Sequence, residues 1–466
     1  MDLRVESDSI GTIEIPEEML YGINTQRAKN NFNISNDTVN IDLTKGIVLI
    51  KKSAAIVNLQ LGLISKNVAS AIIDSCDKIL KDGLDFSFIT HPLQGGAGTS
   101  TNMNVNEVIA NLAIEQLGGT RGDYSLVHPI NDVNCSQSTN DVYPTAIRIA
   151  SIYKIRKLAK ALAQLQESLQ KKENEFADVL KLGRTQLSDA LPITLGQEFG
   201  SYARAISRDR WRIYKVEERL REVNIGGTAI GTSLNASLEY IYKITETLQN
   251  LTGLGLARSD FLVDPTQNMD IFVEVSGLLK SCAVNLIKIA NDIRLMASGP
   301  KGGLNEIHLQ PLQAGSSIMP GKVNPVMCEM LIQVSYKVIG NDSCITAAAY
   351  SGQLELNAFS PLIADSLLNS LELLTNGIHL FDNLCIKNIK ANETNCTNTV
   401  KNSSALSAVL IPYIGYDKAA DIATKAFKTN KTIETILLEE RIFTEEKINH
   451  IMDVYQITNP GISERS

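Results

Sequence analysis

The chain has 466 residues, of which 44% are hydrophobic and 20% charged, and its formal net charge is −7 at pH 7. This composition is ordinary for a globular protein and lacks the clustered basic footprint of a nucleic-acid-binding protein. No apolar run approaches the roughly 20 residues of a membrane span, and the first residues lack the pattern of a signal peptide. We therefore expect a cytoplasmic protein with neither nucleic acid nor membrane as a partner.

The seven cysteines and five histidines are scattered, with no Cys-x-x-Cys pair and no His-Glu-x-x-His motif. This spacing predicts free thiols, no disulfide framework and no metal site. Two glycine-containing segments resemble nucleotide-binding loops without matching them. Five residues rather than four separate Gly315 from Gly321, and the segment 94–101 lacks the third glycine of a dinucleotide fingerprint. We therefore expect no cofactor.

The N-terminal third, residues 1–138, is broken by Pro16 and glycines, and its helices, such as one over 47–64, are expected to be short. Its first polar segment, 94–104, has three glycines followed by hydroxyl and amide side chains. Backbone N–H groups in such a segment can surround an anion. A cluster that caps a helix N-terminus would explain the same residues.

The central region, residues 139–396, has the pattern of a bundle of long helices. Apolar residues recur at heptad spacing from Ile155 to Leu169 and again from Leu279 to Met296. The first of these helices is expected to begin near Thr145, so the polar segment 136–141 precedes it and is also explained as a helix cap.

Two further polar segments interrupt the central region. In the segment 183–189, Arg184 and Thr185 could hold a carboxylate, although a salt-bridged turn is the simpler interpretation. The segment 313–325 places two serines, a lysine and an asparagine between two glycines and two prolines. Such a loop can move and can present polar groups to a ligand.

The pattern of the last region, residues 397–466, predicts short helices over 418–426, 433–440 and 445–452. The sequence thus predicts a mainly all-α chain of three domains, with boundaries near residues 138 and 396 and a central long-helix bundle.

Taken together, the four polar segments resemble the aspartase/fumarase superfamily in order and spacing, and 315–325 resembles its signature loop. The resemblance covers essentially the whole chain, from the segment 21–27 onward. Members of this superfamily eliminate ammonia, water or an amine from a succinyl skeleton and release fumarate. The resemblance implies a homotetramer in which three subunits contribute to each active site.

The resemblance also implies a role for each polar residue. Ser316 would be the general base that removes the Cβ proton, and Gly315 and Gly321 would be the loop hinges. Because no histidine adjoins the loop in sequence, with His308 eight residues before Ser316, activation of the serine must come from positive charge or backbone donors. The implied substrate-binding residues are Thr99, Ser138, Thr139, Asn140, Thr185, Lys322 and Asn324.

Local departures favour ammonia as the leaving group. The segments 94–100, 303–307, 312–315 and 352–354 resemble the ammonia-eliminating members, and Gln186, a further candidate for substrate binding, stands where fumarases carry histidine. The expected reaction is the reversible deamination of L-aspartate to fumarate and ammonium through an aci-carboxylate. A class II fumarase is the alternative, and an inactive structural relative is a more remote one.

One motif departs from the family. Around His128, Ile130 shifts the phase of the common pattern and no histidine precedes Val133. We therefore expect His128 to have a structural role, and we do not expect the secondary anion site of fumarases at this position.

Overall fold

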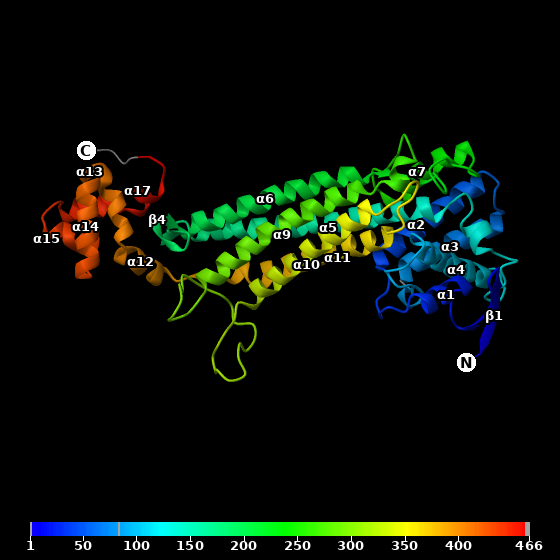
Figure 1. Ribbon diagram of the computed structural model, residues 1–466, viewed down its shortest axis with the longest axis horizontal. Helices are drawn as coiled ribbons and strands as arrows, with labels where there is room; N and C mark the ends of the chain where they lie inside the picture. The colour runs from blue at the N-terminus through cyan, green and yellow to red at the C-terminus, as the bar shows by residue number, and fades with distance from the viewer. Residues whose placement is uncertain (1, 83, 462–466) are drawn as a thin grey trace. The chain divides into compact units, whose positions relative to one another are not determined.

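A computed structural model describes residues 2–82 and 84–461. Helices dominate these residues (Figure 1), and the strands form only two-stranded sheets. The expectation of a mainly all-α chain is therefore confirmed. In the described part, no helix is both long and apolar enough to cross a membrane.

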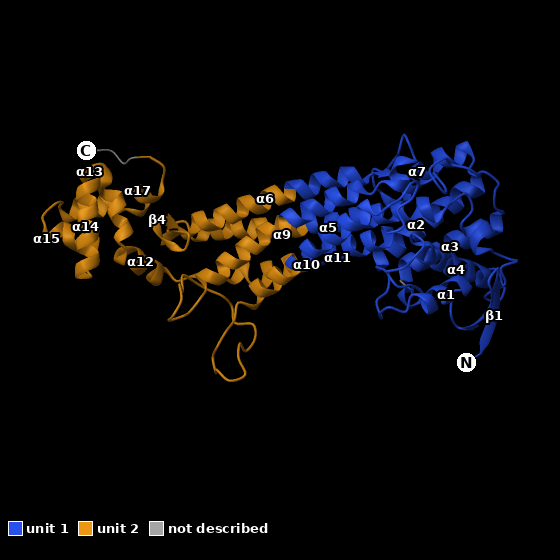
Figure 2. Ribbon diagram, in the orientation of Figure 1, with its two compact units in different colours: residues 1–159, 211–281, 336–375 blue, residues 160–210, 282–335, 376–466 orange. Residues whose placement is uncertain are grey.

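The chain divides into two compact units (Figure 2). Unit 1 comprises residues 1–159, 211–281 and 336–375, and unit 2 comprises residues 160–210, 282–335 and 376–466. Five long helices have residues in both units. They are α5 (Thr139–Glu175), α6 (Leu195–Leu220), α9 (Asp270–Met296), α10 (Val326–Tyr350) and α11 (Ser360–Leu384). The predicted domain boundaries near residues 138 and 396 remain predictions.

The other elements of unit 1 are shorter. Its helices are α1 (Ile23–Asn31), α2 (Ile41–Gln60), α3 (Lys66–Asp82), α4 (Thr99–Gln116), α7 (Leu238–Thr252) and α8 (Asp264–Gln267), with a 3-10 turn at Asp85–Ser87 and a π-helix at Pro129–Val133. Strands β1 (Leu3–Asp8) and β2 (Gly11–Pro16) pair antiparallel, whereas β5 (Glu222–Val223) and β6 (Ala257–Arg258) pair parallel.

Unit 2 contains two antiparallel pairs, β3 (Leu180–Thr185) with β4 (Ser188–Thr194) and β7 (Ile307–His308) with β8 (Lys390–Ala391). Its C-terminal helices are α12 (Glu393–Asn402), α13 (Ile411–Ile414), α14 (Tyr416–Thr429), α15 (Ile433–Glu439), α16 (Glu445–Ile451) and α17 (Val454–Thr458), with 3-10 turns at Ile386–Asn388 and Ser404–Leu410. Helices α14 to α16 confirm the three short helices expected there, and they share a core that includes Ile422, Leu437 and Ile448.

The two heptad patterns are confirmed as buried seams. Every residue from Ile155 to Leu169 and from Leu279 to Met296 that defined them is buried. A strip of apolar side chains on one helix face is removed from water by packing against neighbouring helices, which stabilises these long helices beyond their own backbone hydrogen bonds.

The expected start of the first long helix was wrong. Helix α5 begins at Thr139 rather than near Thr145, and Pro144 lies inside it. A proline there has no N–H for the carbonyl of Asn140. The Nδ2 of Asn224 donates to that carbonyl instead, at 3.0 Å. A partner far along the chain thus offsets the missing bond and lets the helix start earlier.

Candidate active site

Thr99 is the first residue of α4, and a glycine sets its position. The preceding Gly98 has φ +95°, and a Cβ there would lie 2.4 Å from the Tyr143 ring of α5. Only glycine allows α4 to begin this close to α5. The exposed hydroxyl of Thr99 donates to the Gly96 carbonyl at 2.7 Å.

The segment Ser138, Thr139 and Asn140 forms the N-terminus of α5. The Ser138 Oγ accepts from the Asn140 N–H at 3.2 Å, so the helix-cap interpretation holds for this serine. The Thr139 Oγ1 accepts from the Nδ2 of Asn102 on α4, at 3.1 Å. Unit 1 thus brings Thr99 and this segment to the starts of two neighbouring helices. Helix N-termini present free N–H groups and attract anions.

Thr185 and Gln186 lie at the tip of the β3–β4 hairpin, and both are exposed. Gln186 and Leu187 form its two-residue turn, with φ of +54° and +65°. Positive φ at both central residues matches the right-handed twist of the flanking strands. The sequence indicated the turn, but it did not predict the strands on either side.

Charged side chains of strand β3 hold this hairpin against a buried carboxylate. Arg184 Nη1 donates to Glu306 Oε1 at 2.6 Å, and Lys181 Nζ lies 3.4 Å from Glu306 Oε2. The Glu306 side chain is fully buried, immediately before β7. The interpretation of 183–189 as a salt-bridged turn is therefore correct, and its partner is the residue that leads into β7.

The loop 315–325 runs between β7 and α10 and is closed at its base. The Gly315 N–H donates to the Lys322 carbonyl, and Asn324 Nδ2 donates to the Gly315 carbonyl, both at 2.8 Å. A Cβ on Gly315 would lie 2.6 Å from the Lys322 oxygen, so glycine is needed for this close approach. Gly321 has φ +80°, which other residues rarely adopt.

The Ser316 hydroxyl lies in this loop and accepts two backbone hydrogen bonds. Its Oγ receives the N–H of Ile318 at 3.2 Å and that of Met319 at 3.0 Å. Donors directed at an oxygen stabilise its negatively charged form. These two N–H groups are therefore backbone donors placed to stabilise the alkoxide form of Ser316.

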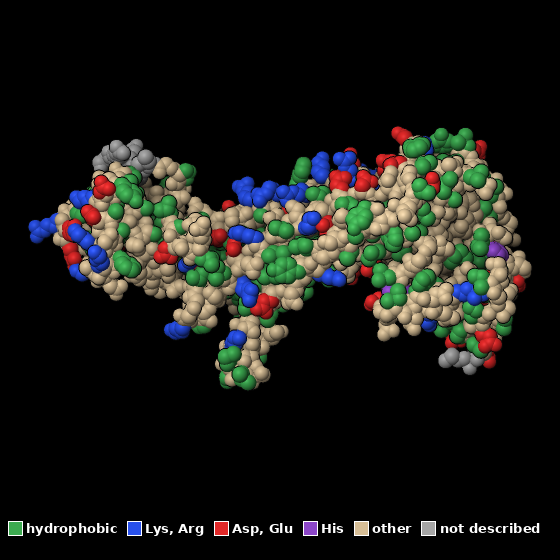
Figure 3. Space-filling model, in the orientation of Figure 1, with side chains coloured by type: hydrophobic (Ala, Val, Ile, Leu, Met, Phe, Trp, Pro, Cys, Tyr) green, Lys and Arg blue, Asp and Glu red, His purple; other side chains and the backbone are tan. Residues whose placement is uncertain are grey.

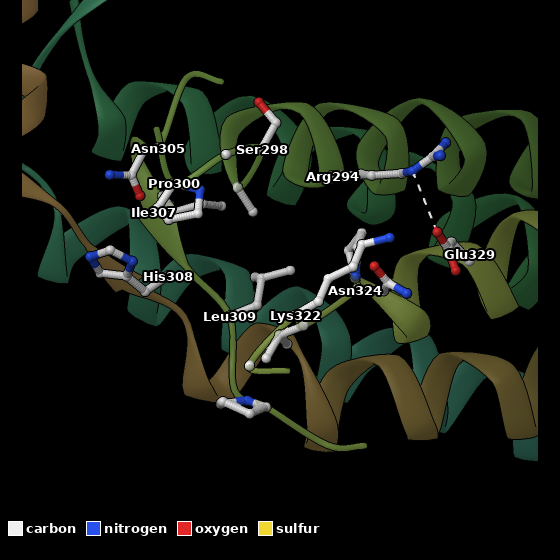
Figure 4. A pocket seen from close by; sticks show the side chains of 16 residues that line it. Arg294, Ser298, Pro300, Asn305, Ile307, His308, Leu309, Lys322, Asn324 and Glu329 are labelled. Carbon is white, nitrogen blue, oxygen red and sulfur yellow. Dashed lines mark ion pairs between the residues drawn. The ribbon is translucent and has the colours of Figure 1, made fainter. Parts of the chain in front are cut away.

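Lys322 and Asn324 line an open cavity of about 750 Å³ in unit 2 (Figure 4). An ion pair between Arg294 of α9 and Glu329 of α10, with Nε and Oε1 3.9 Å apart, lies along the same cavity. His308 of β7 also belongs to the lining. Ser316, Thr185 and Gln186 are outside the set of residues that line it.

Three polar residues that line this cavity were not among the site residues predicted from the sequence. His308 was set aside because it is eight residues from Ser316, yet it shares the cavity with Lys322 and Asn324. Glu329 gave a usable signal, since it lies in the first turn of the helix that follows the loop. Arg294 gave none, because its place in the cavity depends on how α9 packs.

Two expectations concern histidine and metals. The Nδ1 of His128 accepts the N–H groups of Ile130 and Asn131 and so caps the π-helix, which agrees with a structural role. Among the described residues, no group of three or more His, Cys, Asp or Glu side chains could hold a metal ion.

Comparison with known families gives the class of protein. The chain matches the family described as Lyase over residues 11–340 and the family described as Fumarase C C-terminus over residues 406–459. The first match covers well over half of the chain, which therefore belongs to this lyase family.

Individual relatives of the chain are aspartate ammonia-lyases. The chain is 46% identical to an aspartate ammonia-lyase of a Bacillus species, covering 100% of this chain and 99% of the relative. It is 43% identical to the aspartate ammonia-lyase of Escherichia coli K12, covering 99% of this chain and 97% of the relative.

Solved structures agree with this. A Brucella melitensis protein described as fumarate lyase:delta crystallin superposes with a TM-score of 0.95 at 44% identity, covering 98% of this chain and all of that one. A class II fumarase from Schistosoma mansoni superposes with a TM-score of 0.93 at 34% identity, with the same coverage.

Proposed function

We infer that this protein is an aspartate ammonia-lyase, a carbon–nitrogen lyase that reversibly converts L-aspartate to fumarate and ammonium. The observation that carries this conclusion is the identity of 43–46% to aspartate ammonia-lyases over essentially the full length. The solved class II fumarase is less similar, at 34% identity. Gln186 at the hairpin tip, where fumarases carry histidine, favours the same choice.

In the proposed mechanism, Lys322 and Asn324 bind one carboxylate of the substrate while Ser316 removes a proton from Cβ. Removal of that proton places a second negative charge on the carboxylate, as an aci-carboxylate. Donors already directed at the developing charge lower the barrier, and each contributes about 2.7–4 kcal/mol of transition-state stabilisation. The aci-carboxylate then collapses and the Cα–N bond breaks, so that the substrate's amino group, which is bound as ammonium, leaves as ammonia while Ser316 keeps the proton taken from Cβ.

Ser316 needs help to act as a base, because an ordinary serine hydroxyl is almost never ionised at neutral pH. The N–H groups of Ile318 and Met319 at its Oγ support the alkoxide form. We propose that the loop closes over the substrate through Gly315 and Gly321, which removes water and strengthens these hydrogen bonds.

The other carboxylate and the amino group of the substrate are proposed to bind at Thr99, Ser138, Thr139 and Asn140, with Thr185 and Gln186 completing the site. Support comes from the position of Thr99 and Thr139 as first residues of α4 and α5. The partial positive charge of two helix N-termini favours an anionic ligand.

We propose that four copies of the chain assemble and share their active sites. The proposed residues divide between unit 1 and unit 2, which is compatible with sites built from more than one chain. Large apolar side chains such as Trp211, Tyr214 and Tyr336 are exposed on α6 and α10. Lys and Arg side chains also gather over α6 (Figure 3). Exposed apolar side chains on a helix face are typical of chains that associate.

We further propose a cytoplasmic location. All seven cysteines carry free thiols, and five of them are buried. Thiols of this kind persist in a reducing compartment.

The activity is tested by following the ultraviolet absorbance of fumarate after mixing the protein with L-aspartate or with L-malate. Fumarate from L-aspartate alone is expected. Fumarate from L-malate alone would assign the chain to the fumarases, and fumarate from neither would leave only a structural relative.

Shared sites are tested by mixing two inactive variants, Ser316→Ala and Thr139→Val, under conditions that exchange subunits. Mixed assemblies would contain sites with both native residues, so activity should return, with a particle mass four times that of one chain. Absence of recovery despite exchange would show that each chain builds its own site.

A further inference from the structure

Lys51 of α2 is fully buried, and its partners are amide oxygens rather than a carboxylate. Its Nζ donates to Asn134 Oδ1 at 2.7 Å and to Gln137 Oε1 at 3.0 Å. Burial lowers the pKa of this lysine to about 7, with Asp141 of α5 and Cys76 of α3 partly opposing the shift. A buried amine is costly, and an apolar side chain of similar size would fill the space at lower cost.

The same asparagine joins Lys51 to the residues proposed to bind substrate. Asn134 Oδ1 also accepts from Asn102 Nδ2, at 3.1 Å, and from Asn106 Nδ2, at 3.2 Å, both on α4. Asn102 in turn donates to the Thr139 Oγ1. A continuous chain of hydrogen bonds therefore runs from Lys51 through Asn134 and Asn102 to Thr139.

A second contact from α2 holds the intervening residues. The Nδ2 of Asn58 donates to the Cys135 carbonyl at 3.0 Å, and its Oδ1 accepts the Ser136 hydroxyl at 3.1 Å. Ser136 has φ +63°, a left-handed conformation that is unfavourable for a serine. Such a backbone persists only where its surroundings enforce it, and it is concentrated at functional sites.

We propose that Lys51 is a positioning residue for the substrate-binding segment 138–140. By fixing Asn134 and Gln137, it holds the start of α5 and, through Asn102, the hydroxyl of Thr139 in the arrangement that receives the substrate. This role rests on the proposed function, because it assumes that Ser138, Thr139 and Asn140 bind L-aspartate. Lys51 itself need not touch the substrate.

The test compares Lys51→Met with Lys52→Met. Lys52 is the next residue of the same helix, but its Nζ pairs with Asp77 at the surface. Methionine keeps the length of the buried side chain and removes its donors, so Lys51→Met should raise KM for L-aspartate by about tenfold or more. It should lower kcat much less, and Lys52→Met should match the wild type in both.

Amide hydrogen exchange supplies a readout that is independent of turnover. Peptides covering 134–141 should exchange about tenfold faster in Lys51→Met than in Lys52→Met. A folded Lys51→Met with wild-type KM would overturn the proposal, even if it were less stable, because a lysine that only stabilises the fold would leave KM unchanged.

If Lys51→Met fails to fold, Asn102→Ala decides the question, because it cuts the link to Thr139 and leaves Lys51 in place. The expected result is the same rise in KM, and an unchanged KM would again overturn the proposal. If the wild type releases no fumarate from L-aspartate, the proposed function fails. Faster exchange of 134–141 in Lys51→Met would then still support the positioning role, and unchanged exchange would overturn it.

Discussion

The two regions that carry the proposed substrate residues are built in opposite ways. In unit 1, the segment 134–141 is half-buried or buried, and side chains of α2 and α4 hold it on several sides. In unit 2, the loop 315–325 is largely exposed, with Ile318 84% accessible, and its base is closed by two hydrogen bonds. The segment 134–141 is fixed by side-chain contacts along its length, whereas the loop 315–325 is held mainly at its base.

In the proposed mechanism, the first region only binds the substrate, whereas the loop carries the base Ser316 in addition to the carboxylate-binding residues Lys322 and Asn324. A segment that recognises one end of a small substrate works best when it is already in place, because ordering it on binding would cost affinity. A loop that carries the base must admit the substrate and then exclude water, so it is held loosely. Loop variants should therefore lose turnover while keeping stability, and variants of buried residues should lose stability or affinity.

The largest effect is expected for Ser316→Ala. A general base contributes about 10²–10⁴-fold to rate, so kcat for L-aspartate should fall by about 10³-fold, with no change in the thermal unfolding midpoint. Ser317→Ala is the matched control, because Ser317 is exposed and adjacent, and it should keep wild-type turnover. Substantial residual activity in Ser316→Ala would exclude this serine as the base.

The next effect is expected for Gly315→Ala. A methyl group there would lie 2.6 Å from the Lys322 oxygen and would force open the base of the loop. Misplacement of reacting groups by about 1 Å can cost about 10²-fold in rate, so kcat should fall by about that factor. Gly302→Ala, whose Cβ meets nothing within 4 Å, should leave kcat unchanged. Equal effects of the two substitutions would argue against a closed loop base.

A stability effect is expected for Glu306→Gln, beneath the hairpin that carries Thr185 and Gln186. Removing one charge from a buried ion pair costs about 3–5 kcal/mol, so the free energy of unfolding should fall by about 3 kcal/mol in denaturant titrations. Glu198→Gln removes the other carboxylate near Lys181, but that side chain is 22% exposed. Its effect should be about 1 kcal/mol or less, and a similar loss for both would contradict the burial argument.

The smallest effect is a change with pH. The pKa of Lys51 is about 7 in the folded chain, against an ordinary lysine value of 10.5. Between these two pH values, the unfolded chain therefore binds more protons than the folded chain. The stability of the wild type should therefore rise relative to Lys51→Met as the pH increases from 7 to 9, by at most about 1.4 kcal/mol per pH unit. Parallel stabilities across this range would show that burial does not shift this pKa.

Local patterns were enough to predict much of the fold. The heptad seams, the short C-terminal helices and the helix-capping role of Ser138 all follow from residues a few positions apart, and the structure agrees with them. The β3–β4 hairpin could not be predicted in this way. Its short strands directly follow a long helix, and buried partners such as Glu306 hold it in place.

The sequence by itself determined the family, the polar segments and the positions of two of the five long helices, because helical periodicity and a signature loop are local properties of the chain. Tertiary structure alone decided which polar groups are buried and joined. Lys51 meets an asparagine 83 residues away, and Arg184 meets a glutamate 122 residues away. Burial of a charge depends on what packs around it, and residues distant in the chain supply those neighbours.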